Sequence, residues 1–208
     1  MMQHRVMIGQ QIGIARDGES ERQHRLSRLR MVAESSCERR WFAVRVMTGR
    51  ETAVEKQLLD MAIEALVPMR KGPDLRRRHR VIPGSMIPVI HGYVLVNMPA
   101  DGVLLAGLSG LEHVISVVGG YETPMPITAE EVRRFKAMAD QGAYDWSAPT
   151  GKSFRSGDVV RIYDGPFVGF AGEVISCRSD GRGDVVLVLD MLGGKVPVTV
   201  PLAICEKL

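Results

Sequence analysis

The sequence predicts an α+β protein with an α/β domain followed by a small all-β domain. Three observations predict this organisation. Between residues 40 and 141, apolar residues at strand spacing alternate with apolar residues at helical spacing. The segment 142–153 has no periodicity and is rich in Gly, Pro and Ser, which is typical of a linker. From 154 to 208 the apolar period is two almost throughout, so only strands are expected there.

The composition excludes several classes of protein. The net charge of +3 is too small to make the whole surface bind nucleic acid, so any such contact must come from a local cluster. The three cysteines have no CxxC spacing, which argues against a disulfide framework or a zinc site. No apolar run approaches the roughly 20 residues that span a bilayer. We therefore expect a soluble, cytoplasmic protein with no membrane contact. We also expect it to be a monomer.

Residues 1–39 differ from the rest because they are polar, charged and rich in arginine. A short helix around 21–33 is conceivable, but the composition favours a flexible extension. Two explanations stay open for it. The start codon could be misassigned, with Met31 as the true start, or the segment could be a basic arm that touches nucleic acid.

The elements of the α/β domain follow in order from residue 41. A strand is expected at 41–48, a helix at 50–66 and a short strand at 66–69. The basic segment 70–88, bounded by Gly-Pro and Pro-Gly, predicts an exposed loop or hairpin. The remaining elements are a strand at 89–98, a helix at 100–110, a strand at 113–120 and a helix at 126–142. Thr128 caps that last helix, and Glu130 and Glu131 favour its first turn.

The all-β domain contains four short strands, at 158–163, 172–177, 184–190 and 195–201. Glycine-rich turns separate them. So many short strands in fewer than sixty residues predict a small closed barrel, because closure removes exposed edges.

Several stretches form a set of motifs that extends over most of the chain. They are "WFAVRVMTGRE", "GYVLVNM", the "GG" after "VISVV" and "PMPITAEEV" in the first domain, and "FRSGDVVRIYDGPFVGFAGEVISC", "VPV" and "ICEKL" in the second. The first domain resembles the N-terminal domain of the NusG family of transcription factors, and the second resembles the KOW domain of that family. The resemblance implies an antiparallel sheet with flanking helices, followed by an SH3-like KOW β-barrel.

The resemblance also implies a binding surface on the strand at 89–98. In the family this segment faces outward in a shallow apolar depression that receives the clamp helices of the largest RNA polymerase subunit. The matching residues here are Ile90, Tyr93 and Leu95, with Met47 at the edge. Ile90 replaces the usual aromatic residue and His91 the usual proline. The alternative interpretation is that Tyr93 and Leu95 are simply core residues.

A run of arginines lies where the family has a basic arm beside the polymerase cleft. We expect it to contact the cleft, non-template DNA or nascent RNA, because guanidinium groups suit phosphate. The run consists of Arg76, Arg77, Arg78 and Arg80. The alternative is a solvated charged loop.

The resemblance assigns partner-binding residues to the KOW domain as well. They are Met191 and Leu192, and we add Phe167 of the glycine-rich turn, which we expect to be partly exposed while Phe170 is core. In the family this region binds the termination factor Rho and a small-subunit ribosomal protein. Leu192 replaces an aromatic residue and Gly194 an arginine, so we expect weakened binding to both and a specialised paralogue.

No set of residues predicts catalysis. None of the five histidines pairs with Cys, Asp or Glu at ligand or triad spacing, and no phosphate-binding glycine loop follows a strand. We expect neither an enzyme nor a cofactor. The function implied is a non-enzymatic elongation factor that binds the polymerase clamp and modulates pausing, processivity and termination or antitermination. Two alternatives stay open: an operon- or phage-specific antiterminator, and a KOW-type RNA-binding or ribosome-associated protein.

Overall fold

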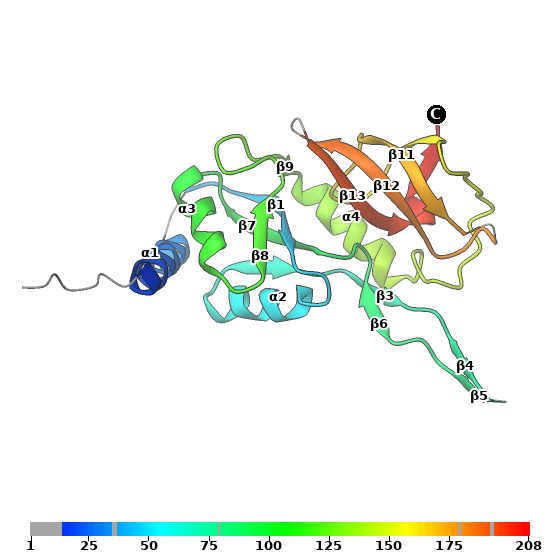
Figure 1. Cartoon of the computed structure of the whole chain (residues 1–208), viewed down its shortest axis with the longest axis horizontal. Helices are drawn as coiled ribbons and strands as arrows, with labels where there is room; N and C mark the ends of the chain where they lie inside the picture. Colours follow the sequence, from blue (N-terminus) through cyan, green and yellow to red (C-terminus); the bar gives the residue numbers. More distant parts are fainter. Residues whose placement is uncertain (1–13, 35–36, 79, 179, 192–193) are drawn as a thin grey trace, which may run out of the picture.

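The computed structural model describes residues 14–34, 37–78, 80–178, 180–191 and 194–208. Its helices and antiparallel sheets form a mixed α/β fold (Figure 1). A first sheet lies in the middle of the view, a C-terminal sheet lies beside it, and a narrow hairpin projects away from both.

The first sheet is antiparallel, with strand order β2-β7-β1-β8 and β9 also paired with β1. Its strands are β1 (Arg39–Val46), β2 (Glu64–Leu66), β7 (Tyr93–Pro99), β8 (Val114–Val117) and β9 (Pro126–Ile127). β1 and β7 pair from Arg39 opposite Pro99 to Arg45 opposite Tyr93. Because side chains alternate along a strand, each of these two central strands contributes to both faces of the sheet.

Both faces of the first sheet are covered, which explains why β7 is apolar along nearly its whole length. One face carries Phe42, Val44, Val94 and Val96, which form a core with helices of the same half of the chain. Those helices are α1 (Ile14–Glu34), α2 (Glu51–Asp60) and α3 (Gly102–Gly107), with the 3₁₀ turn η1 (Leu108–Gly110). The other face carries Trp41, Ala43, Tyr93 and Leu95, and it packs under α4 (Ala129–Asp140) and the C-terminal sheet.

Residues 14–34 form a docked helix, so the flexible extension expected for residues 1–39 is wrong over this range. Leu29 and Val32 of α1 are fully buried. Arg22 donates to the Gly110 carbonyl at 3.1 Å, and Arg25 to the Ser109 hydroxyl at 3.0 Å. The apolar residues, spaced three apart, share one face of the helix, while the arginines extend over the neighbouring turn. Residues 1–13 lie outside the described part of the chain.

Two helices of the first half differ in how well the sequence predicts them. α4 is confirmed, with the Thr128 hydroxyl and the Glu131 carboxylate forming a reciprocal capping box. α2 ends at Asp60 instead of continuing to 66, because the chain reverses at Ala62, whose φ of 59° is incompatible with a helix. The residues from Glu64 onward then enter β2.

The basic segment forms the predicted hairpin. At its base β3 (Met69–Lys71) pairs with β6 (Met86–Pro88), and beyond it β4 (Leu75–Arg77) pairs with β5 (Arg80–Ile82). Figure 1 shows this ribbon projecting well beyond both sheets.

The C-terminal sheet is antiparallel, in the order β13-β12-β11-β10-β14. Its strands are β10 (Val159–Ile162), β11 (Ala171–Cys177), β12 (Asp184–Met191), β13 (Gly194–Pro201) and β14 (Cys205–Lys207), the last after a 3₁₀ turn, η2 (Leu202–Ile204). The described residues show no pairing between β13 and β14, so the closed barrel stays a prediction. None of the described helices is long and apolar enough to cross a membrane.

Candidate partner-binding surface beneath the C-terminal sheet

The residues predicted to form an exposed apolar depression are buried in this structure. Ile90, Tyr93 and Leu95 are 5%, 6% and 3% exposed, respectively. They belong to one core together with residues of the C-terminal sheet. The expectation that they face outward is wrong for this conformation, because the C-terminal sheet lies over them.

An aromatic contact forms the centre of this cover. The ring of Phe167, in the turn between β10 and β11, meets the ring of Tyr93 edge-on with centroids 4.9 Å apart. Phe167 is fully buried and Phe170 is half-buried, which reverses the expected exposure of the two. Gly165 lets this turn reach α4: its φ is 85°, and a Cβ there would lie 2.9 Å from the Phe135 ring. The turn therefore fits closely against both the first sheet and α4.

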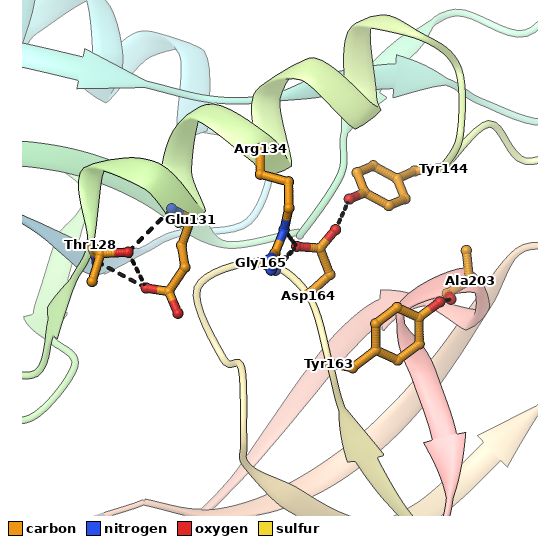
Figure 2. Close-up of polar contacts among 8 residues, drawn as sticks. All are labelled: Thr128, Glu131, Arg134, Tyr144, Tyr163, Asp164, Gly165 and Ala203. Carbon is orange, nitrogen blue, oxygen red and sulfur yellow. Dashed lines mark hydrogen bonds and ion pairs between the residues drawn. The ribbon is translucent and has the colours of Figure 1, made fainter.

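A buried carboxylate of the same turn holds it to the first half of the chain. Asp164 accepts from Arg134 of α4 at 3.0 and 3.2 Å, from the hydroxyl of Tyr144 and from the Gly165 amide (Figure 2). Burial and the bond to Asp164 raise the pKa of the Tyr144 hydroxyl, so it stays a donor across the physiological range. Asp164 thus joins the helix, the linker and the C-terminal sheet.

A second carboxylate connects the two halves at the start of β12. Asp184 accepts from Arg70 of β3 at 2.5 Å, and the Arg70 side chain is fully buried. The other oxygen of Asp184 lies 3.9 Å from Nε2 of His91. Arg70 also donates to the Tyr144 carbonyl at 3.0 Å and lies 5.6 Å from the centre of the Trp146 ring. Burial raises the pKa of the Asp184 carboxyl, although Arg70 and His91 act to lower it.

Two polar atoms at this contact have no hydrogen-bond partner among the described residues. They are the hydroxyl of Tyr93 and Nε of Arg70. A buried polar group without a partner costs about 1–3 kcal/mol, because it loses water and gains nothing in return. The covered arrangement is therefore less favourable than its large apolar area suggests.

Of the other predicted binding residues, Met191 belongs to the same core as Tyr93, whereas Met47 does not. Met47 follows β1 and is half exposed, outside the two buried clusters. Met191 at the end of β12 is buried, whereas Leu192 lies outside the described residues. The structure thus brings Ile90, Tyr93 and Leu95 together with Phe167 and leaves Met47 at the surface.

The four arginines near the tip of the hairpin, Arg76, Arg77, Arg78 and Arg80, are exposed. Arg77 and Arg80 lie directly opposite each other across β4 and β5, and Arg78 at the tip has a φ of 44°. Among the described residues, none of Arg76, Arg77, Arg78 and Arg80 forms an ion pair. Like charges directly opposite each other destabilise a ribbon. The hairpin therefore carries a concentrated positive charge that nothing in the described part of the chain neutralises.

The polar contacts between the halves are the site residues that sequence reasoning missed. Arg70 and Asp184 are 114 positions apart, and Arg134 and Asp164 are 30 apart. No local spacing connects such pairs. The available signal was weak: Asp164 directly follows one predicted strand and Asp184 begins another, each next to glycine, where a charged residue usually indicates an exposed turn.

The chemistry of this region is that of binding. Its residues offer an apolar face, aromatic rings and cations, and the described residues contain no group of three His, Cys, Asp or Glu that could hold a metal ion. The apolar face of the first sheet and the separate sheet that covers it across a linker have the composition typical of a protein-binding surface.

Comparisons with known proteins identify the class more closely. Residues 39–136 match the family model described as "Transcription termination factor nusG". The NusG protein of Synechocystis sp., named as a transcription termination/antitermination protein, is 28% identical over 188 residues, covering 80% of this chain and 88% of that protein. The corresponding protein of Pseudomonas aeruginosa is 27% identical over 187 residues, covering 81% and 98%.

Among solved structures, one of domain interaction in Thermotoga maritima NusG is similar, with 22% identity and a TM-score of 0.40, covering 82% of this chain and 98% of that one. Residues 39–136 thus match the NusG family, and most of the chain is similar to NusG proteins named as transcription termination/antitermination proteins.

Proposed function

We propose that this chain is a non-enzymatic transcription elongation factor that binds RNA polymerase through the face of the first sheet around Tyr93. By its resemblance to the family, the partner element is the pair of clamp helices, and the consequence is altered pausing, processivity and termination or antitermination. The observation that carries the proposal is the composition of this face, with Ile90, Tyr93 and Leu95 gathered beside cationic groups. An aromatic centre with a polar rim is typical of protein interfaces.

The proposal requires two conformations of the chain. In the covered form, described above, Phe167 occupies the face that the clamp helices would need. In the uncovered form, the C-terminal sheet has moved away on the linker 142–153, which contains no helix or strand. The C-terminal sheet and the clamp helices cannot occupy the Tyr93 face at the same time. Polymerase binding therefore shifts the chain toward the uncovered form.

When the C-terminal sheet leaves the Tyr93 face, it also becomes free to bind a second partner. Phe167 is buried in the covered form and becomes accessible only in the uncovered form. Rho or a small-subunit ribosomal protein would then bind near polymerase at a high effective concentration. The departures at Leu192 and Gly194 make this second contact weaker than in most of the family.

The hairpin supplies a further contact in the proposed complex. Its four exposed arginines project from the body of the molecule and suit phosphate, with little sequence preference (Figure 1). We assign them to the nucleic-acid backbone beside the polymerase cleft. The repulsion between Arg77 and Arg80 is relieved when a polyanion lies against the ribbon.

Substitutions at Tyr93 and at Phe167 should change the affinity for RNA polymerase in opposite directions, and this difference tests the proposal. Tyr93→Ala with Leu95→Ala should lower the affinity for core RNA polymerase at least tenfold, since truncated interface centres typically cost about 2 kcal/mol or more. Phe167→Ala should raise it, because the competing ring is removed. Ile115→Ala, at a half-exposed position of β8, is the matched control.

The readout is equilibrium binding to core polymerase, with circular dichroism to show that each variant is folded. Equal affinity of folded Tyr93→Ala, Leu95→Ala and wild-type protein would place the polymerase contact elsewhere. Tight binding to structured RNA, together with no polymerase binding even for Phe167→Ala, would favour the RNA-binding alternative.

A further inference from the structure

The face around Tyr93 is cationic as well as apolar. Its charged groups are the ones that contact a carboxylate of the covering sheet. Arg70 is fully buried with its charge directed at Asp184, and His91 approaches the same carboxylate from the turn that precedes Tyr93. When the C-terminal sheet moves away, Phe167 and Asp184 leave together. The face then presents apolar side chains next to two nitrogen groups that have lost their anion.

The contact with Asp184 is more than a surface ion pair. Asp184 itself is only 12% exposed, and its partner Arg70 is completely enclosed. Removing one member of such a buried pair leaves an uncompensated charge, which is strongly destabilising. Asp184 therefore contributes to holding the cover in place, in addition to the apolar contact of Phe167.

The same geometry limits what can replace the cover. A partner that brings only apolar groups to Tyr93 and Leu95 would leave Arg70 and His91 without the anion they have in the covered form. A nucleic acid would supply an anion but no aliphatic side chain to cover Tyr93 and Leu95. A protein segment with an apolar side chain and a neighbouring carboxylate satisfies both requirements.

We propose that Phe167 and Asp184 imitate the natural ligand of this face, which is an acidic and apolar protein segment whose carboxylate replaces Asp184 on Arg70 and His91. The inference rests on the proposed polymerase contact and states the chemistry of that contact. Asp184 has two effects, and both act against the partner: it keeps the face covered, and it occupies the site that the partner's carboxylate needs.

The covered and uncovered forms can be measured without polymerase. Nitroxide labels at exposed positions in the two halves, Lys56→Cys in α2 and Glu173→Cys in β11, report their separation by pulsed electron resonance. Cys37→Ser and Cys177→Ser remove the accessible thiols. Asp184→Asn should shift the equilibrium toward the uncovered form on the order of a hundred-fold.

Two further points concern this measurement: the reactivity of the remaining thiol, Cys205, and a control substitution on β12, the strand of Asp184. Burial raises the pKa of the Cys205 thiol to about 12, so it does not react with the label. Asp190→Asn removes an exposed carboxylate of β12 and should leave the distance distribution unchanged. An unchanged distribution for Asp184→Asn would overturn the role of Asp184 in holding the cover.

The chemistry of the partner is tested in the uncovered background. Asp184→Asn should raise polymerase affinity, and adding Arg70→Gln should lower it again by about tenfold while the labels still report the uncovered form. His91→Gln is the second variant, in case loss of Arg70 prevents folding. If neither change lowers affinity, the face does not bind a carboxylate and the inference is wrong.

Other outcomes separate this inference from the proposed function. An uncovered Asp184→Asn variant with no gain in polymerase affinity would contradict the polymerase contact while leaving the role of Asp184 intact. Opening of the wild-type chain by single-stranded RNA in place of polymerase would assign the face to nucleic acid and would overturn the acidic-segment proposal.

Discussion

The ring of Tyr93 meets the ring of Phe167 edge-on, with planes inclined by 81°, yet the Tyr93 hydroxyl has no hydrogen-bond partner among the described residues. Edge-to-face packing stabilises an aromatic pair by about 0.5–1.5 kcal/mol beyond area burial. An unpaired buried hydroxyl opposes this by a similar amount. The unpaired hydroxyl therefore offsets the gain from edge-to-face packing, which leaves the burial of apolar area as the main stabilising contribution of this contact.

The first prediction compares the same substitution at two tyrosines. Tyr93→Phe removes a hydroxyl without a partner and should raise the free energy of unfolding by about 1 kcal/mol. Tyr144→Phe removes the bond to Asp164 and should lower it by about 1–3 kcal/mol, because the buried carboxylate loses a donor. Urea unfolding of both variants provides the measurement. Destabilisation by Tyr93→Phe would show that its hydroxyl has a partner in solution.

The second prediction compares two glycines at the N-terminal helix. A Cβ at Gly110 would lie 2.8 Å from Cβ of Arg25, so Gly110→Ala should push α1 away and lower the melting temperature. Gly18 lies within α1, is exposed and has no atom within 4 Å of such a Cβ. Gly18→Ala should therefore stabilise the protein by about 0.5–1 kcal/mol.

Scanning calorimetry of the full chain measures both variants. If Gly110→Ala melts like the wild type, α1 does not dock on η1 in solution. The flexible extension expected from the sequence would then regain support for these residues, because buried Leu29 is the main reason to count α1 as part of the fold.

The sequence predicted the elements whose signals are local. The capping residues of α4, the apolar run of β7 and the hairpin between Gly-Pro and Pro-Gly each depend on neighbouring residues, and each appears in the structure. The docking of α1 was missed because a helix with few apolar residues, Leu26, Leu29 and Val32 among them, resembles a solvated segment until its partner surface is known.

The candidate site shows the same limit more sharply. Resemblance to a family indicated Ile90, Tyr93 and Leu95, but periodicity cannot show whether the chain's own second sheet covers them. That depends on long-range pairs such as Arg70 with Asp184, and a buried ion pair between distant residues leaves no pattern in the sequence. Whether these side chains are exposed or covered is therefore a property of the whole chain.

The last prediction concerns the hairpin and salt. If its arginines contact phosphates, the logarithm of affinity for duplex DNA should fall with the logarithm of salt concentration, with a slope of about −0.9 for each contact. Replacing Arg76, Arg77, Arg78 and Arg80 by glutamine should reduce the magnitude of that slope by about 3 to 4. Fluorescence anisotropy between 50 and about 200 mM salt covers the range in which the effect is large.

The control for the hairpin uses arginines from another surface. Arg28 and Arg30 are exposed on α1, and Figure 1 shows that helix at the opposite end of the molecule from the hairpin. Changing both to glutamine alters the net charge without touching the ribbon. A slope that drops in proportion to charge for this variant too would mean that the protein attracts DNA through its overall charge. A slope that changes only with the hairpin variant would assign the phosphate contacts to the ribbon, because counterion release counts the cations that meet phosphate directly.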